Sequence, residues 1–242
     1  MDAPTAPARH IATLTPGALR AALRADPRLL LPVGALSVRW PHLPVAADTI
    51  IVDHLADDLS ARCGVLRAPT VGYGATAPAP ATALGATSVR KKTLHRLLND
   101  LLAEWEVHGV DEFVLLTVHR HDPHLEALAT VITARARVRV VDALAVNCAD
   151  LLDSPEGDAR GDEVATSLLL HLAPELVHAD ERSDARNIAP HPAPGSASAD
   201  KGARLYARIL GRIAERVLGT PLAGPALADA PAGRPPLLST QS

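Results

Sequence analysis

Short apolar runs typical of buried strands alternate along this chain with longer segments of helical periodicity. Residues 29–34 (LLLPVG) and 113–118 (FVLLTV) are runs of the first kind, because strands covered on both faces lack polar alternation. Strand and helix in alternation indicate an α/β fold, with an open, mostly parallel sheet flanked by helices. The further predicted strands span residues 64–69 and 134–144, and the predicted helices span residues 49–62, 94–105, 164–172 and 201–217.

In a sheet of this kind, ligands bind outside the carboxyl ends of the strands. The loops 35–48 and 118–124 follow the first strand and the strand at 113–118, so we expect them to build the functional site. The aperiodic segment 70–88, rich in Gly, Pro, Ala and Thr, adds a long loop, and such loops are usually functional. Residues 150–162 are polar and are predicted to form a loop as well.

Composition and charge exclude several function classes. The chain has 242 residues, with 24 Lys and Arg against 27 Asp and Glu, and its aromatic residues are two Trp, two Tyr and one Phe. This near-neutral balance and the scarcity of stacking side chains argue against nucleic-acid binding. No uncharged apolar run long enough for a membrane span occurs. There is no signal-peptide pattern, and Cys63 and Cys148 are expected to be reduced thiols, so a cytoplasmic protein is predicted.

One domain is expected over residues 11–218. Residues 1–10 are rich in Pro and Ala and are predicted to be a flexible N-terminus, and the Pro/Ala-rich tail 219–242 is predicted to be disordered. Local signals mark the helix ends inside the domain. Asp48 is the expected N-cap of the first of these helices, Gly109 the C′ residue of the helix at 94–105, and Asp122 a cap followed by Pro123.

Several short motifs occur in the order found in creatininase-type amidohydrolases. Residues 31–34 (LPVG) and 41–44 (PHLP), followed by Asp48, resemble the opening signature of that family. The chain is similar to the family over about residues 13–218, and residues 166–174 (TSLLLHLAP) are similar to the branch that trims the precursor peptide in mycofactocin maturation. The other matching stretches are residues 73–74 (YG), 85–89 (GATSV), 117–119 (TVH) and 199–202 (ADKG).

The resemblance implies a single creatininase-like domain that assembles into oligomers and hydrolyses C–N amide bonds with two divalent ions. That chemistry needs a bridging carboxylate, several His and Glu ligands and an activated water. This chain departs from the pattern, because Ser37, Val38 and Arg39 stand where the family has Glu-Gln-His. The bridging Asp is matched by Asp48, and a ligand His is matched by His119. Where some members carry a Glu ligand, this chain has His121.

Three interpretations of Asp48 are open. It caps a helix, or it binds one divalent ion, Zn or Mn, together with His119 and His121. In the third interpretation it pairs with Arg39, whose permanent charge would replace the metal, because an unpaired buried carboxylate is costly. For the two histidines, the alternative to metal binding is an exposed polar loop.

The resemblance places further residues around the same crevice: Trp40, which would fill or reshape it, His42, Tyr73 and His124. Glu163 aligns with a less constant family Glu and is a candidate catalytic group. A metal-free mechanism with Ser37 as nucleophile and His119 as base is a further hypothesis, although no nucleophile elbow surrounds Ser37.

Two functions are predicted from these residues. In the first, the protein is a family member with a degenerate dinuclear site, a possible pseudoenzyme without metal that acts by ligand binding or by assembly with an active homologue. In the second, it is a metal-dependent amidohydrolase or peptidase with a rebuilt site for one divalent ion. Both predict a small-molecule amide or peptide ligand and a homo-oligomer or hetero-oligomer, with no nucleic acid and no membrane as partner.

Overall fold

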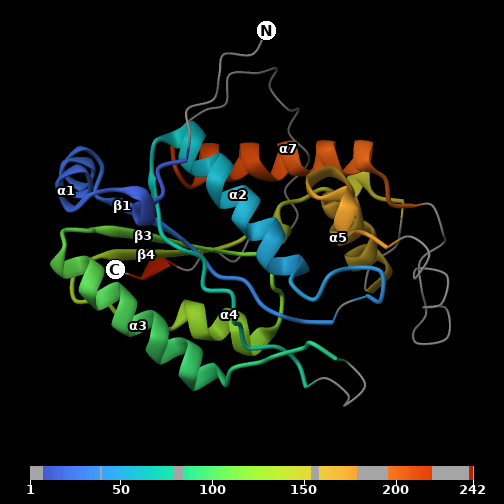
Figure 1. Cartoon of the computed structure of the whole chain (residues 1–242), viewed down its shortest axis with the longest axis horizontal. Coiled ribbons are helices and arrows are strands. Elements are labelled where there is room, and N and C mark those ends of the chain that lie inside the picture. Colours follow the sequence, from blue (N-terminus) through green and yellow to red (C-terminus); the bar gives the residue numbers. More distant parts are fainter. Residues whose placement is uncertain are drawn as a thin grey trace, which may run out of the picture.

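The computed structural model describes residues 8–38, 40–78, 84–153, 158–178, 196–219 and 240–241, with the backbone alone for 158–162 and 240–241. Helices and strands alternate along the chain, as expected (Figure 1). The strands are β1 (Arg28–Pro32), β2 (Leu66–Arg67), β3 (Glu112–Thr117), β4 (Arg137–Asp142) and β5 (Thr240–Gln241). The α-helices are α1 (Pro16–Ala25), α2 (Ala47–Cys63), α3 (Lys91–Val107), α4 (Asp122–Ala129), α5 (Asp158–Leu172) and α7 (Ala199–Arg216).

The strands form one sheet in the order β2-β1-β3-β4-β5. Strands β1 to β4 are parallel, with β1 between β2 and β3, while β5 pairs antiparallel to β4. Parallel pairing requires a crossover between consecutive strands, and α2, α3 and α4 provide the crossovers. The predicted fold class, an α/β domain with an open, mostly parallel sheet, is therefore confirmed.

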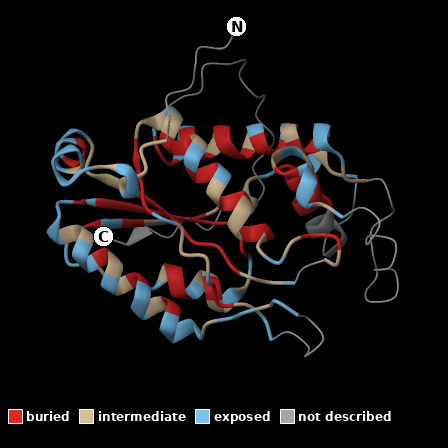
Figure 2. Ribbon diagram, in the orientation of Figure 1, coloured by how far each residue is buried: buried red, intermediate tan, exposed pale blue. Residues whose placement is uncertain are grey.

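Helices cover both faces of the sheet, with α2, α5 and α7 on one side and α3 and α4 on the other (Figure 1). Successive strand side chains point to opposite faces. Leu30 and Leu116 thus join the core beneath α2, α5 and α7, whereas Leu29 and Leu115 join the core beside α1, α3 and α4. The strands and the inner faces of the helices are buried, while the outer face of α3 is largely exposed (Figure 2).

Helices α5 and α7 cross closely in the first of these layers. A Cβ atom on Gly202 would clash with the carbonyl oxygen of Ser167, so the crossing requires glycine at this position. This packing also explains a wrong prediction. Residues 158–162 belong to α5 and not to a loop, because a helix docked along another helix can extend through polar residues with little apolar periodicity.

Other helix ends also differ from the predictions. The cap of α2 is Ala46, so Asp48 lies in the first turn of the helix and is not its N-cap. Likewise, His121 occupies the cap position of α4, and Asp122 is the first helical residue. The prediction for Gly109 agrees with its position two residues after α3 and its φ of 100°. Among the described residues, no helix combines the length and apolar character needed to cross a membrane.

Candidate functional site

The candidate site lies where the carboxyl ends of β1 and β3 adjoin. These strands are neighbours, with Pro32 opposite Leu116, yet the chain leaves them in opposite directions, toward β2 after β1 and toward β4 after β3. Such a reversal opens a crevice at which α/β proteins bind ligands. The loop after β1 leads to Asp48 in the first turn of α2, and His119 follows β3 by two residues. The two loops expected to build the site are thus the ones that meet here.

Asp48 and His119 are hydrogen-bonded to each other inside this crevice. His119 Nδ1 donates to Asp48 Oδ2 at 2.7 Å, and the two residues are 6% and 2% exposed. A carboxylate only accepts hydrogen bonds, so the proton is on Nδ1. The N-terminal end of α2 also favours the negative charge of Asp48. Within the described part of the chain, His119 Nε2 is buried and has no hydrogen-bond partner, so the exposed-loop interpretation of His119 is wrong.

Ser37 approaches the same carboxylate oxygen. Its Oγ lies 3.5 Å from Asp48 Oδ2. The resulting order is Ser-Asp-His, whereas a nucleophilic serine needs the histidine between itself and the carboxylate. This contact therefore orients Asp48 and gives Ser37 no general base.

His124 and Thr117 stand behind the His119 ring. The two imidazole rings meet edge to face, with centroids 5.0 Å apart and an interplanar angle of 84°. Thr117 Oγ1 accepts a hydrogen bond from the His119 backbone N–H at 3.1 Å and is also hydrogen-bonded to His124 Nε2 at 3.1 Å. Burial lowers the pKa of His124 to about 3, with a smaller contribution from His119, so this ring is neutral. No role for Thr117 was predicted from its sequence context.

His121 lies at the edge of this group, half-buried. Its Nδ1 is hydrogen-bonded to the carbonyl oxygen of Ala75 at 3.0 Å, and its ring centroid is 6.1 Å from that of His119. The segment around Ala75 lies tightly against the end of β1. A Cβ on Gly74 would be 2.7 Å from both the Gly34 carbonyl oxygen and His124 Nδ1, which accounts for glycine there.

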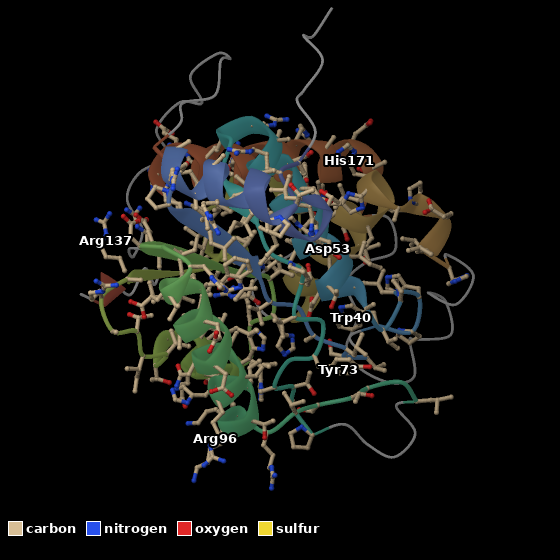
Figure 3. The ribbon with its side chains drawn as sticks, turned by 60° about the vertical axis from the view of Figure 1, so that its left-hand side comes forward. Trp40, Asp53, Tyr73, Arg96, Arg137 and His171 are labelled. Carbon is tan, nitrogen blue, oxygen red and sulfur yellow. The ribbon has the colours of Figure 1, made fainter. Side chains whose placement is uncertain are left out.

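The remaining predicted pocket residues border the crevice from two loops. His42 is buried, and its Nε2 is 2.9 Å from Thr166 Oγ1 on α5, so it anchors its loop to that helix. Trp40 packs against the core beneath α2 and α5, whereas Tyr73 is 53% exposed. Both lie on the same side of the molecule (Figure 3). Arg39 lies outside the described residues, so its pairing with Asp48 stays a prediction.

Glu163 belongs to a buried ion pair between α5 and α7. Its carboxylate pairs with Lys201 Nζ and accepts the Asp153 backbone N–H at 2.9 Å. Lys201 also pairs with Asp153, at 2.8 Å. These contacts give Glu163 a structural role in joining two helices. The sequence analysis assigned no role to Lys201. A lysine in an amphipathic helix could have indicated a buried ion pair with an acidic residue of a neighbouring helix.

Among the residues that the structure describes, the donor atoms at this crevice do not form the ligand set of a two-ion centre. Asp48 and His119 are bonded to each other, and Ser37 and Val38 supply no carboxylate or imidazole in place of the family's ligands. Across the described ranges, no three His, Cys, Asp or Glu side chains converge in a group that could hold a metal ion. Of the predicted set, Asp48 and His119 are therefore in contact, whereas His121 is hydrogen-bonded to the Ala75 carbonyl instead.

Comparison with known proteins agrees with this fold. The family model for creatininase (creatinine amidohydrolase) matches residues 12–217. Two mycofactocin precursor peptide peptidases are similar: that of Mycolicibacterium smegmatis is 30% identical over 164 residues (64% of this chain, 62% of that protein), and that of Mycobacterium ulcerans is 31% identical over 169 residues (65% and 63%). The aligned part thus spans less than two thirds of each relative.

Solved structures match more of the chain. A creatininase variant of the Zn–Zn type superposes with a TM-score of 0.76 at 21% identity, and the Mn form of creatininase with 0.72 at 24%. Both matches cover 87% of this chain and 97% of the other. At these identities the structural matches show a shared fold only. The family model, in contrast, matches the sequence of nearly the whole described domain. The chain belongs to the creatininase family.

Proposed function

We propose that this protein is a creatininase-family member with a degenerate metal site, which binds an amide-containing small molecule or peptide and does not perform two-ion hydrolysis. The observation that carries the proposal is the hydrogen bond between Asp48 and His119. Asp48, which matches the family's metal-bridging Asp, is thus hydrogen-bonded to His119 where the family's carboxylate binds cations. A buried carboxylate needs such a partner, because an unpaired buried charge is strongly destabilising.

The binding atom in this proposal is His119 Nε2, which is buried in the structure, so a ligand would reach it only when the loops that border the crevice move apart. Its ring already donates through Nδ1, so Nε2 offers a lone pair to a hydrogen-bond donor on a ligand. An amide N–H is such a donor, and the two relatives named as precursor peptide peptidases favour a peptide or another amide as the ligand. Assembly with further copies, or with an active homologue, and a cytoplasmic location are parts of the same proposal.

The metal content of the purified protein tests this proposal. We expect elemental mass spectrometry to find far less than one Zn or Mn per chain, and the melting temperature to stay the same when a chelator is added. One tightly held ion per chain, with a lower melting temperature after chelation, would overturn the proposal.

A metal-dependent amidohydrolase or peptidase with one ion is the second candidate. The observation that favours it is that Nδ1 of His121 has an oxygen partner, the Ala75 carbonyl, which leaves Nε2 of this ring to face an ion. Metal-binding histidines usually have their second nitrogen fixed in this way. Asp48, His119 and His121 would hold the ion, which would supply an activated water. This candidate predicts amide hydrolysis that depends on added Zn or Mn and is lost in His121→Asn.

A further inference from the structure

We propose that His124 is a positioning residue, which fixes the His119 ring so that Nδ1 faces Asp48 and Nε2 stays available to a ligand. The proposal rests on the proposed function only for the choice of Nε2 as the binding atom. Nothing in the family resemblance assigns this role to His124, which the resemblance only places around the crevice.

The contacts around His124 restrain the His119 ring from behind. The edge of one imidazole meets the face of the other at a centroid distance of 5.0 Å, and a turn of the His119 ring would disrupt this packing. Thr117 joins the two residues a second time, because its Oγ1 bonds both the His119 backbone N–H and His124 Nε2. Both the ring and the backbone of His119 therefore depend on the same pair of side chains.

His124 is itself held in place on its far side. It is fully buried, and its Nδ1 faces Gly74 so closely that a Cβ there would be only 2.7 Å away. The ring thus fills the space between the 72–75 segment and Thr117 and has no room to swing away from His119. An aliphatic side chain would fill this space, but it could not bond Thr117, and the hydroxyl that orients His119 would lose a partner.

Imidazole nitrogen spectroscopy tests the proposal. Protein labelled with 15N in its histidines, in the presence of a chelator, would be measured by long-range 1H–15N correlation, with His119→Gln identifying the His119 signals. In the wild type we expect one His119 form, protonated at Nδ1. In Thr117→Val and His124→Phe we expect the two His119 nitrogen shifts to move toward each other, as rings with either nitrogen protonated interconvert.

Two variants separate positioning from general damage. Thr117→Ser keeps the hydroxyl and should restore the wild-type His119 pattern, and the control His95→Phe, which removes an imidazole bonded to the Thr130 carbonyl on the outer layer, should leave it unchanged. An unchanged His119 pattern in folded Thr117→Val would overturn the proposal. So would a wild-type His119 that is already a mixture of forms, a result that needs no variant to fold. The spectra are recorded with a chelator present, so they test the role of His124 independently of metal. A tightly bound metal ion in the purified protein would instead overturn the proposed function.

Discussion

His119 Nδ1 and Asp48 Oδ2 lie 2.7 Å apart although 71 positions separate the two residues in the chain. The contact joins the loop after β1 to the loop after β3, and it is buried on both sides. The contact therefore links the two loops that border the crevice, and substitutions at either residue test its contribution to stability.

Replacing Asp48 by Asn should weaken this contact and destabilise the fold. A hydrogen bond to a charged group contributes about 1.5–3 kcal/mol, so we expect the free energy of unfolding to fall by about 2 kcal/mol in urea titrations. Asp100→Asn, on the exposed face of α3, is the matched control and should stay within about 0.5 kcal/mol of the wild type. Equal effects of the two substitutions would contradict a stabilising buried hydrogen bond at Asp48.

Stability should depend on pH through His124. Its pKa is about 3 in the folded protein and about 6.5 in the unfolded chain, so the unfolded chain binds more protons between these values. Stability is then full above about pH 6.5 and falls as the pH drops toward 3, by up to about 1.4 kcal/mol per pH unit for one proton. Melting temperatures from pH 7 to pH 4 should fall less steeply in His124→Asn, and parallel curves would show that His124 does not carry this dependence.

Removing the cation between α5 and α7 should be costly. Lys201→Met removes the ion pair that Lys201 forms with the fully buried Glu163, which predicts a loss of about 3 kcal/mol. The double variant Lys201→Met/Glu163→Gln should recover part of that loss, because the amide that replaces the buried carboxylate carries no charge to be compensated. Chemical denaturation of the three proteins measures this, and a double variant that is no more stable than Lys201→Met would refute the explanation.

Two glycine-to-alanine substitutions should change the stability of the protein in opposite directions. Gly202→Ala places a methyl group against the Ser167 carbonyl at the α5–α7 crossing, and overpacking of this kind costs about 1–3 kcal/mol. Gly17, on α1, has no atom within 4 Å of an added Cβ, so Gly17→Ala should stabilise the protein by about 0.5–1 kcal/mol. Thermal melting of both variants compares the two predictions directly, and a stabilising Gly202→Ala would mean that the helices can move apart.

The parts of the fold that could be predicted are those in which local pattern and tertiary packing agree. The apolar runs at β1 and β3 indicated buried parallel strands, and their loops indicated the crevice. The start of α5 was not predicted, because it depends on the docking of that helix onto α7. Helix α1 was not predicted either, since its cap at Thr15 and Pro16 lies next to a segment that reads as flexible.

The site could be predicted only as a set of positions. Sequence comparison identified Asp48 and His119, but two residues 71 positions apart give no sign that they bond to each other. The roles of Thr117 and Thr166 are invisible for the same reason, since a hydroxyl acquires its function from what the fold places beside it. For His121 the sequence suggested more than the structure contains. Its residue type and its position two residues after His119 suit a metal ligand, but its ring does not converge with Asp48 and His119 into a ligand set.

The hydrogen bond between Asp48 and His119 also has a consequence for any cation that enters the crevice. An ion that binds Asp48 Oδ2 has to displace this formed hydrogen bond before it gains full coordination. A single added carboxylate, for example in Ser37→Glu, should therefore bring little metal affinity, because the gain from one more ligand is offset by the loss of the hydrogen bond.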